Sequence, residues 1–458
     1  MEKRKFRLAD VVLSVICVVF VAEAAAPVAS IGNSQYFWWL FMILAFLLPY
    51  GLISSELGTA FPGDGGLYDW IHTAWPDSRW GARASWYYWI NFPLWMASLA
   101  VMCPELLGYV LGWQPGPVWS LVIQLAFIWI VTVVAFYPVC DSIVILNLSA
   151  AIKILLAVTV GVLGIVYVAR NGFVNDMSAG TFLPSFDLDS LSYISVIIFN
   201  FLGFEVVCTY ANNMSDPKKQ IPQSIVTGGI VIAAIYLFSA FGIGAAVDVR
   251  EISVDSGLID AVSLILGRSG GVFVGLVALF FLVTLFGNMI SWSMGVNSTA
   301  ALAADHNDMP RVFAKRWAKN DMPVGAAVTS GVVASCVCVL GVLIEMASPD
   351  SSLFWSFFAL NLVMLLLSYL PVFPAFLKLR REDAKTPRPF RVPGSDTALK
   401  WIAYVPMVLI VISIIFTAVP LSFDAETLAS FLPITIGSIL SVAIGEVLIA
   451  LRGKNARS

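Results

Sequence analysis

The sequence predicts an all-α membrane protein with twelve transmembrane helices, and two observations support this class. First, 59% of the 458 residues are hydrophobic, 12% are charged and the mean hydropathy is +0.88, which lies outside the range of soluble globular domains. Second, twelve apolar stretches are each long enough to cross a hydrocarbon core of about 30 Å, which needs about 20 helical residues. Because these stretches are continuous rather than alternating, we expect helices and not a β-barrel.

The predicted helices cover most of the chain, approximately at residues 8–30, 37–61, 84–112, 117–137, 142–169, 190–212, 222–247, 270–303, 323–346, 353–377, 401–421 and 428–451. Helices one to five (8–169) and six to ten (190–379) have similar lengths, and each group begins with an interrupted helix. This pattern predicts a five-plus-five inverted repeat in a single transmembrane domain of residues 1–458, with two additional helices in residues 400–451.

Two predicted helices are interrupted at corresponding positions. The first places Glu23 in the middle of the membrane, directly before Ala24-Ala25-Ala26-Pro27, and the sixth contains the break from Asn200 to Glu205. Pro27 cannot donate a backbone hydrogen bond, and Gly203 has the matching role in the sixth helix. A carboxylate in a membrane segment costs roughly 2.5 kcal/mol or more unless it faces a polar cavity or a partner. Paired interrupted helices of this kind indicate the binding site of a transporter.

The distribution of Lys and Arg predicts the orientation. With both termini in the cytoplasm, 22 of the 26 basic residues lie on the cytoplasmic side, and Arg170, Arg250 and Arg268 lie on the opposite side. This asymmetry agrees with the positive-inside rule. Lys153 is the remaining basic residue and lies inside the fifth helix. We therefore expect a multi-pass protein of the cytoplasmic membrane.

Other functional classes have little support in the sequence. His72 and His306 lie in separate loops, and the six cysteines lack metal-ligand spacing. We expect no enzyme activity, no catalytic residues, no metal and no cofactor, and there is no nucleic-acid footprint. The first apolar run is too long for a cleavable signal and is expected to be retained. A transporter-like membrane sensor is the alternative from another class, although it would normally carry an added soluble domain.

Four stretches resemble motifs of the amino acid–polyamine–organocation transporters. They are Ser55–Tyr68, Gly203–Glu205 with Asp216–Pro222, Ala303–Phe313, and Arg388–Gly394. The matches span almost the whole chain in the right order. The resemblance implies the leucine-transporter fold, with the substrate held midway across the membrane between broken helices one and six and helices three, eight and ten.

The break in the first helix departs from the family pattern. Many members carry a Gly-Ser-Gly type run there, whose N–H groups hold a substrate carboxylate, whereas this chain has Glu23, Ala24 and Ala25. An anionic side chain repels a carboxylate and attracts an ammonium. We expect a small amine, polyamine or amino acid substrate whose ammonium is read by Glu23. Two alternatives stay open: an exchanger that holds a carboxylate on the unwound backbone, and a Glu23 neutralised by protonation or an internal partner.

Aromatic and amide side chains complete the predicted substrate site. Aromatic faces bind amines by cation–π attraction, and Phe199 and Trp292 align with pocket-lining aromatic positions of related antiporters. We expect these two to enclose the substrate beside Gly203. Weaker candidates are Asn91 and Trp95 in the third helix and Asn361 in the tenth.

Gating and coupling are predicted at four further residues. A buried lysine must be paired or lose its charge, and the resemblance implies that Lys153 occupies the place of the sodium ion of sodium-coupled relatives. Its ammonium would bridge helices one and eight near Ser291 or Ser293, although a structural lysine is the alternative. The resemblance ties Glu205 to gating or helix pairing.

The resemblance thus implies a sodium-independent secondary active transporter, either an antiporter or a proton-coupled symporter, that works by alternating access. Its expected partners are the small-molecule substrate and the lipid bilayer. The oligomeric state has no signature in the sequence.

Overall fold

The computed structural model describes residues 5–21, 28–186, 190–191, 193–252, 257–266, 271–347, 353–420, 422 and 425–455, and the regular elements in these ranges are helices. Ten helices in this part of the chain are long and apolar enough to cross a membrane. Two shorter apolar helical segments, Leu8–Val19 and Ile194–Cys208, correspond to the predicted first and sixth helices. The all-α membrane class is therefore confirmed.

The α-helices are α1 (Leu8–Val19), α3 (Ser34–Met42), α4 (Leu48–Ala60), α5 (Leu67–Ala74), α6 (Trp80–Leu111), α7 (Pro117–Val134), α8 (Val139–Asn171), α10 (Ile194–Phe199), α11 (Phe204–Cys208), α12 (Pro217–Ala246), α13 (Gly257–Ile265), α14 (Gly271–Asp305), α15 (Val324–Ala347), α16 (Leu353–Tyr369), α17 (Val372–Glu382), α18 (Asp396–Ala418) and α19 (Ala425–Asn455).

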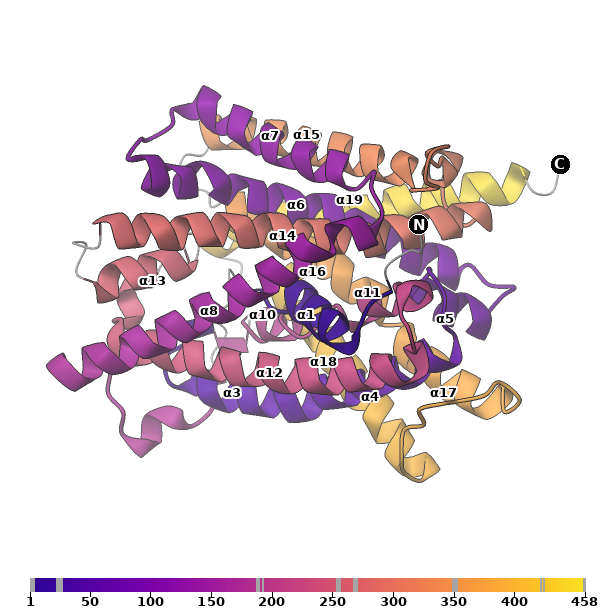
Figure 1. Ribbon diagram of the computed structural model, residues 1–458, viewed down its shortest axis with the longest axis horizontal. Helices are drawn as coiled ribbons and strands as arrows, with labels where there is room; N and C mark the ends of the chain where they lie inside the picture. The colour runs from indigo at the N-terminus through magenta and orange to yellow at the C-terminus, as the bar shows by residue number, and fades with distance from the viewer. Residues whose placement is uncertain are drawn as a thin grey trace.

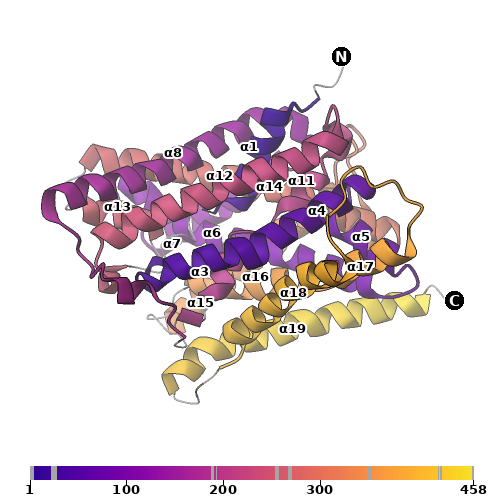
Figure 2. The same ribbon diagram turned by 90° about the horizontal axis from the view of Figure 1, so that it is seen from below.

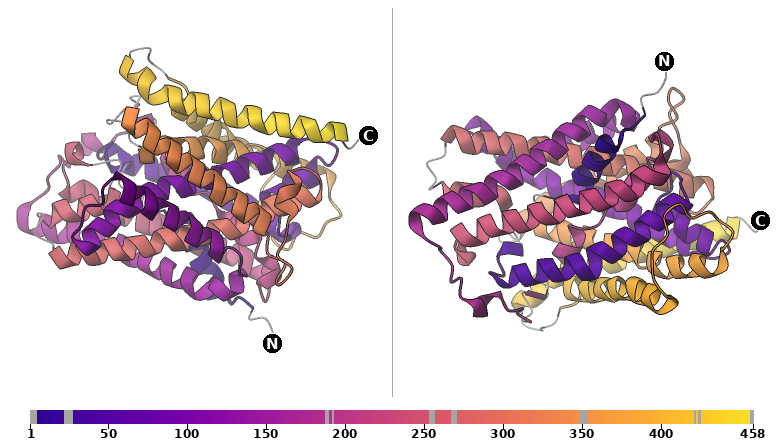
Figure 3. Two further views of the ribbon diagram at one scale, coloured as in Figure 1. Left: turned by 90° about the horizontal axis from the view of Figure 1, so that it is seen from above. Right: turned by 60° about the horizontal axis from the view of Figure 1, so that its bottom comes forward.

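The short helices at the two predicted breaks, α1, α10 and α11, are surrounded by longer helices. Figure 1 shows α1, α10 and α11 near the centre, with α7 and α15 on one side and α3, α4 and α12 on the other. α1 packs against α8, α11, α12 and α14, and α6 packs extensively against α14 and α16. Figures 2 and 3 show that α19 runs along one edge, where it contacts α6, α16 and α18. The broken segments are therefore enclosed by other helices, which is the position that exposed backbone polar groups require in a membrane.

The interruption of the sixth helix is resolved in full. α10 ends at Phe199, and α11 begins at Phe204 after four residues that are not helical. Gly203, at the N-cap of α11, has φ = +119°, a backbone conformation that only glycine adopts readily. A Cβ atom on Gly203 would lie 2.7 Å from Val18 Cγ1, so the absence of a side chain also lets the break approach the end of α1.

The first helix ends earlier than the hydrophobic stretch that predicted it. α1 ends at Val19, and Phe20 is extended, with φ = −74° and ψ = 113°. Glu23, Ala24 and Ala25 lie outside the described residues. In the described part of the chain, helical structure therefore ends at Val19, before the predicted break.

Several boundaries differ from the predicted ones for local reasons. The second predicted helix begins at Ser34 and contains a π-helical turn at Ile43–Leu47. Pro49, which has no N–H to donate, follows this turn in the first turn of α4. The turn-rich stretch after this helix contains α5, and α13 precedes the eighth predicted helix. These two short helices were not predicted because neither is long enough to give a membrane signal.

Gly203→Ala should destabilise the protein by about 1–3 kcal/mol, because alanine is strained at this φ and its Cβ would collide with α1. Gly112→Ala is the matched control, since Gly112 also has a positive φ of +64° but a Cβ atom added there would meet nothing within 4 Å. Denaturant unfolding of purified protein in detergent micelles measures both variants. Equal losses of stability would show that contact with α1 contributes nothing at Gly203.

Candidate functional site

The end of α1 presents backbone carbonyls inside the bundle. The last turn of any α-helix leaves its C=O groups without intrahelical donors. Lys153 Nζ, which is fully buried on α8, donates to Cys17 O at 2.8 Å and to Phe20 O at 2.5 Å. These carbonyls carry the negative end of the α1 dipole and stabilise an ammonium there. In the structure, Lys153 therefore lies against the end of α1.

Two side chains of α14 donate to the same end of α1. Asn288 Nδ2 lies 3.4 Å from Cys17 O and 3.5 Å from Val18 O, and Trp292 Nε1 donates to Val18 O at 3.2 Å. The other end of the Asn288 amide, Oδ1, accepts a hydrogen bond from Trp95 Nε1 on α6 at 3.1 Å. The end of α1 is thus held by donors from α8 and α14.

The two serines predicted to lie near Lys153 have other roles in the structure. Ser293 Oγ donates to Ile290 O of its own helix at 2.8 Å. Ser291 accepts a hydrogen bond from Tyr210 Oη at its carbonyl, at 2.9 Å, and its buried hydroxyl has no hydrogen-bond partner among the described residues. Asn288, one turn before Trp292, provides the contact from α14 to the carbonyl that Lys153 also binds.

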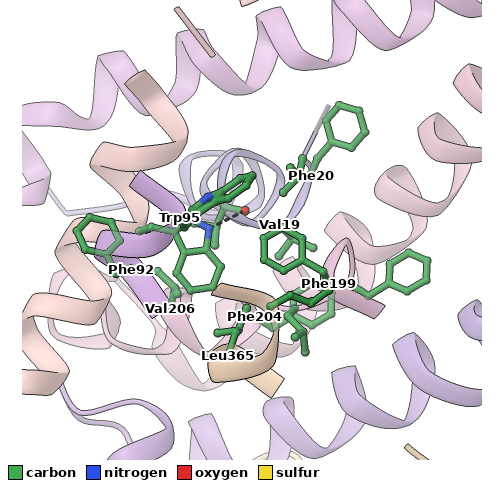
Figure 4. Close-up of a cluster of buried hydrophobic side chains, with 14 of the residues drawn as sticks. Val19, Phe20, Phe92, Trp95, Phe199, Phe204, Val206 and Leu365 are labelled. Carbon is green, nitrogen blue, oxygen red and sulfur yellow. Dashed lines mark hydrogen bonds between the residues drawn. The ribbon is translucent and has the colours of Figure 1, made fainter. Parts of the chain in front are cut away.

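Three aromatic rings form a compact group beside the sixth-helix break. Trp95 of α6, Phe199 of α10 and Phe358 of α16 have ring centroids 5.0–5.5 Å apart, with the Trp95–Phe199 and Phe199–Phe358 pairs edge to face. Figure 4 shows Trp95 and Phe199 among buried side chains that include Val19 and Phe20 from the end of α1. We refer to Trp95, Phe199 and Phe358 as the aromatic group.

Trp292 lies against Gly203 in the sixth-helix break. A Cβ atom on Gly203 would be 3.3 Å from Trp292 Cζ2, so the indole ring covers this glycine. Its ring partner is Tyr88, at a centroid distance of 6.2 Å. Phe199 and Trp292 therefore flank the break but belong to different ring contacts.

The two amides that the sequence predicts in the substrate site, Asn91 and Asn361, differ in their hydrogen bonding. Asn91 is buried and its Nδ2 donates to Tyr88 O, which ties it to its own helix. Asn361 is fully buried on α16, and its Nδ2 lies 3.5 Å from Phe358 O. Its Oδ1 has no hydrogen-bond partner among the described residues. Asn361 thus offers an unused acceptor one turn from the aromatic group.

Glu205 lies in a tyrosine cluster rather than against the aromatic group. Its carboxylate accepts hydrogen bonds from Tyr50 Oη of α4 at 2.5 Å and from Tyr88 Oη of α6 at 2.7 Å. The Tyr369 ring of α16 lies 5.6 Å from that of Tyr50 and 6.5 Å from that of Tyr88. Glu205 is fully buried, and the two hydroxyl donors compensate part of the lost hydration of its carboxylate. The cluster joins α4, α6 and α11, which suits a role in holding helices together.

A second buried carboxylate anchors the loop after α17. Glu56 of α4 is fully buried and pairs with Arg380, while Arg388 Nη1 lies 3.5 Å from its Oε1. The backbone N–H of Val392 also donates to Glu56 Oε2, at 2.7 Å. The motif glutamate of the second predicted helix therefore binds both α17, through Arg380, and the loop that follows it, through Arg388 and Val392.

The two histidines, His72 and His306, lie side by side in the structure. The rings of His72 and His306 are stacked with centroids 5.2 Å apart, and Tyr68 Oη donates to Asp308 Oδ2 at 2.9 Å. His72 Nδ1 lies 3.3 Å from the same Asp308 oxygen. Burial, followed by the negative charge of Asp308, raises the pKa of Tyr68 above its usual value. The cluster connects α5 with the loop after α14 through neutral and charge-assisted hydrogen bonds.

Sequence reasoning missed Asn288, Phe358 and the tyrosines around Glu205. Asn288 could have been found as an amide inside a membrane helix, since such groups need partners there. The tyrosines and Phe358 had no comparable signal, because aromatic residues are common throughout the chain.

Comparisons with known proteins agree with this architecture. A family profile described as amino acid permease matches residues 6–444. A probable agmatine/putrescine antiporter of Lactococcus lactis subsp. lactis is 58% identical over 95% of this chain and 92% of its own length. A glutamate/gamma-aminobutyrate antiporter of the same organism is 20% identical, covering 82% of this chain and 76% of its own. A probable polyamine transporter of Arabidopsis thaliana is 24% identical, with coverages of 89% and 81%.

Glu56→Ala should lower the free energy of unfolding by about 3–5 kcal/mol, because it leaves two arginines and a backbone N–H without their shared acceptor. Glu382→Ala is the control on α17, since Glu382 forms an exposed pair with Lys378 at 3.6 Å and should lose less than about 1 kcal/mol. Unfolding in detergent micelles measures both. Similar losses would contradict an anchoring role for Glu56.

Proposed function

Because the chain belongs to the amino acid permease family of the amino acid–polyamine–organocation superfamily and is a membrane-embedded secondary transporter, we propose that it exchanges agmatine for putrescine. The observation that carries this proposal is the 58% identity to a probable agmatine/putrescine antiporter over 95% of the chain. The amino acid antiporter and the plant polyamine transporter reach only 20% and 24%. The proposal narrows the candidate substrates from the small amines and amino acids of the family to two diamines.

The chemistry of the described site supports a cationic substrate. Agmatine carries a guanidinium and an ammonium, and putrescine carries two ammonium groups, so both are dications at neutral pH. The aromatic group offers ring faces, which attract desolvated cations by about 2 kcal/mol. Asn361 Oδ1 is an acceptor with no hydrogen-bond partner in the described part of the chain. One-for-one exchange of two dications would move no net charge.

The alternative, an exchanger that reads a substrate carboxylate at the end of α1, has less support. A carboxylate needs free N–H groups. The N–H of Val21, the last described residue before the predicted break, already donates to Tyr236 Oη at 2.8 Å. The described end of α1 therefore offers acceptors, and these are occupied by Lys153, Asn288 and Trp292.

We propose that Glu23 reads one ammonium of the substrate, with Ala24 and Ala25 as its unwound neighbours. Phe199 and Trp292, on either side of the Gly203 break, would flank the rest of the substrate. In this scheme Lys153 occupies the place of a sodium ion and makes transport sodium-independent. Glu205 would join helices on one side of the site during gating.

The proposed transport cycle is alternating access between two inverted repeats, residues 8–169 and 190–379. The protein would lie in the cell membrane with both termini in the cytoplasm. The excess of Lys and Arg in the loops on that side supports this orientation.

Proteoliposomes loaded with putrescine should take up external radiolabelled agmatine, and empty proteoliposomes should take up at least about tenfold less. Uptake should be the same when external sodium is replaced by choline. Exchange of glutamate for gamma-aminobutyrate, with no exchange of diamines, would identify the amino acid alternative. A steep dependence on sodium would contradict the role proposed for Lys153.

Glu23→Gln should abolish agmatine–putrescine exchange, because it removes the negative charge that an ammonium requires in a dry site, while leaving side-chain size unchanged. Insertion and stability should stay near those of the parent, as measured by size-exclusion profile and thermal unfolding. Glu251→Gln is the control, since Glu251 is an exposed carboxylate. Parental exchange kinetics in the Glu23 variant would remove this residue from the site.

A further inference from the structure

We infer that Asn288 is a positioning residue that couples the aromatic group to the end of α1. Its amide joins the two: Nδ2 faces Cys17 O and Val18 O at 3.4 and 3.5 Å, and Oδ1 accepts from Trp95 Nε1 at 3.1 Å. Asn288 is fully buried, so its bonds are protected from competing water. That substrate contacts the aromatic group rests on the proposed function, whereas the link itself rests on the geometry.

The chemistry of the partners determines how this amide is oriented. The α1 carbonyls can only accept hydrogen bonds, and the indole N–H of Trp95 can only donate one. The amide must therefore point its nitrogen to α1 and its oxygen to α6. Leucine matches asparagine approximately in size but can make neither bond, and serine is too short to make both. The position thus requires a side chain with a donor and an acceptor at opposite corners.

Asn288 shares its acceptors with two other donors. Lys153 Nζ also donates to Cys17 O, and Trp292 Nε1 also donates to Val18 O. The three side chains come from α8 and α14 and converge on one turn of α1. Asn288 differs from Lys153 in that its opposite end is bonded to a ring of the aromatic group. It therefore connects the group that would contact substrate with the backbone at which helix one is broken.

This connection gives an exchanger a way to sense whether its site is occupied. Trp95 packs edge to face on Phe199, at the end of α10, so a cation that orders these rings also fixes the indole N–H. The fixed indole orients the Asn288 amide, which then holds the end of α1. Without substrate, a mobile Trp95 would loosen the same bonds. A ligand can bias a conformational equilibrium only through contacts that differ between states, and this chain of bonds provides one.

The first test does not use substrate. Cys17 is a fully buried thiol in the last turn of α1, so its reaction with N-ethylmaleimide reports opening of that turn. In the full-length protein in lipid nanodiscs, Asn288→Leu should raise the rate of Cys17 modification about fivefold or more, as measured by mass spectrometry of the peptide. Asn297→Leu is the control, because Asn297 is a buried amide of the same helix that accepts from Ser330 Oγ at 3.4 Å. It should change the rate by less than about twofold.

Trp95→Phe keeps an aromatic ring but removes the indole N–H, and it keeps the test decisive if Asn288→Leu fails to fold. If the inference holds, this change in α6 also raises Cys17 reactivity, although residue 95 does not bond α1 itself. Unchanged Cys17 reactivity in Trp95→Phe or in Asn288→Leu would overturn the coupling.

The second test is a double-mutant cycle on the KM of agmatine exchange. Asn288→Leu and Trp95→Phe should each raise KM about tenfold, the scale of one lost buried hydrogen bond. The double variant should resemble one single variant, because both changes remove the same link. A roughly hundredfold increase in the double variant would show independent effects and contradict the inference. If the parent exchanges no diamine but Cys17 responds as expected, the proposed function fails and the positioning role stands.

Discussion

A helix that ends inside a membrane must have hydrogen-bond partners for the carbonyls of its last turn, and the architecture of this protein depends on that requirement. α1 ends at Val19, which is fully buried among other helices, and lipid would offer its carbonyls no donor. The partners come from neighbouring helices: an ammonium from α8, and an amide and an indole from α14. These hydrogen bonds add to the packing of α8 and α14 against α1. Because they come from α8 and α14, a movement of either helix would alter the hydrogen bonds at the end of α1.

The break in the sixth helix follows a different rule. It is maintained by glycine, whose positive φ and missing side chain let α11 start against Val18 and Trp292. The polar group that follows, Glu205, bonds to tyrosines of α4 and α6 instead of facing the aromatic group. The end of α1 is therefore bound by donors to its carbonyls, whereas the break in the sixth helix depends on the absence of a side chain. The two meet at Gly203 and Val18.

Charge pairing at one end of the bundle is separate from the site. Glu56 binds the loop after α17 through Arg388 and Val392, and the histidine cluster binds the loop after α14. Both attach long connections to the first third of the chain. These contacts join segments that the sequence places hundreds of residues apart, which is why motif residues such as Glu56 gave no indication of their partners.

The sequence by itself determined the membrane class, the helical fold, the transporter family and the position of the break in the sixth helix, because each follows from hydropathy, motifs or a local glycine signal. The family resemblance also implied a place for Lys153 beside helix one. The roles of Glu23, Ala24 and Ala25 stay predictions, since these residues lie outside the described part of the chain. Only the tertiary structure decided that Asn288, rather than Ser291 or Ser293, is the α14 side chain bonded to the carbonyl that Lys153 binds. It also decided that Phe199 packs with Trp95 and Phe358 while Trp292 covers Gly203. The physical reason is that hydropathy is a property of one segment, whereas the partner of a buried polar or aromatic group depends on how several helices are rotated against each other.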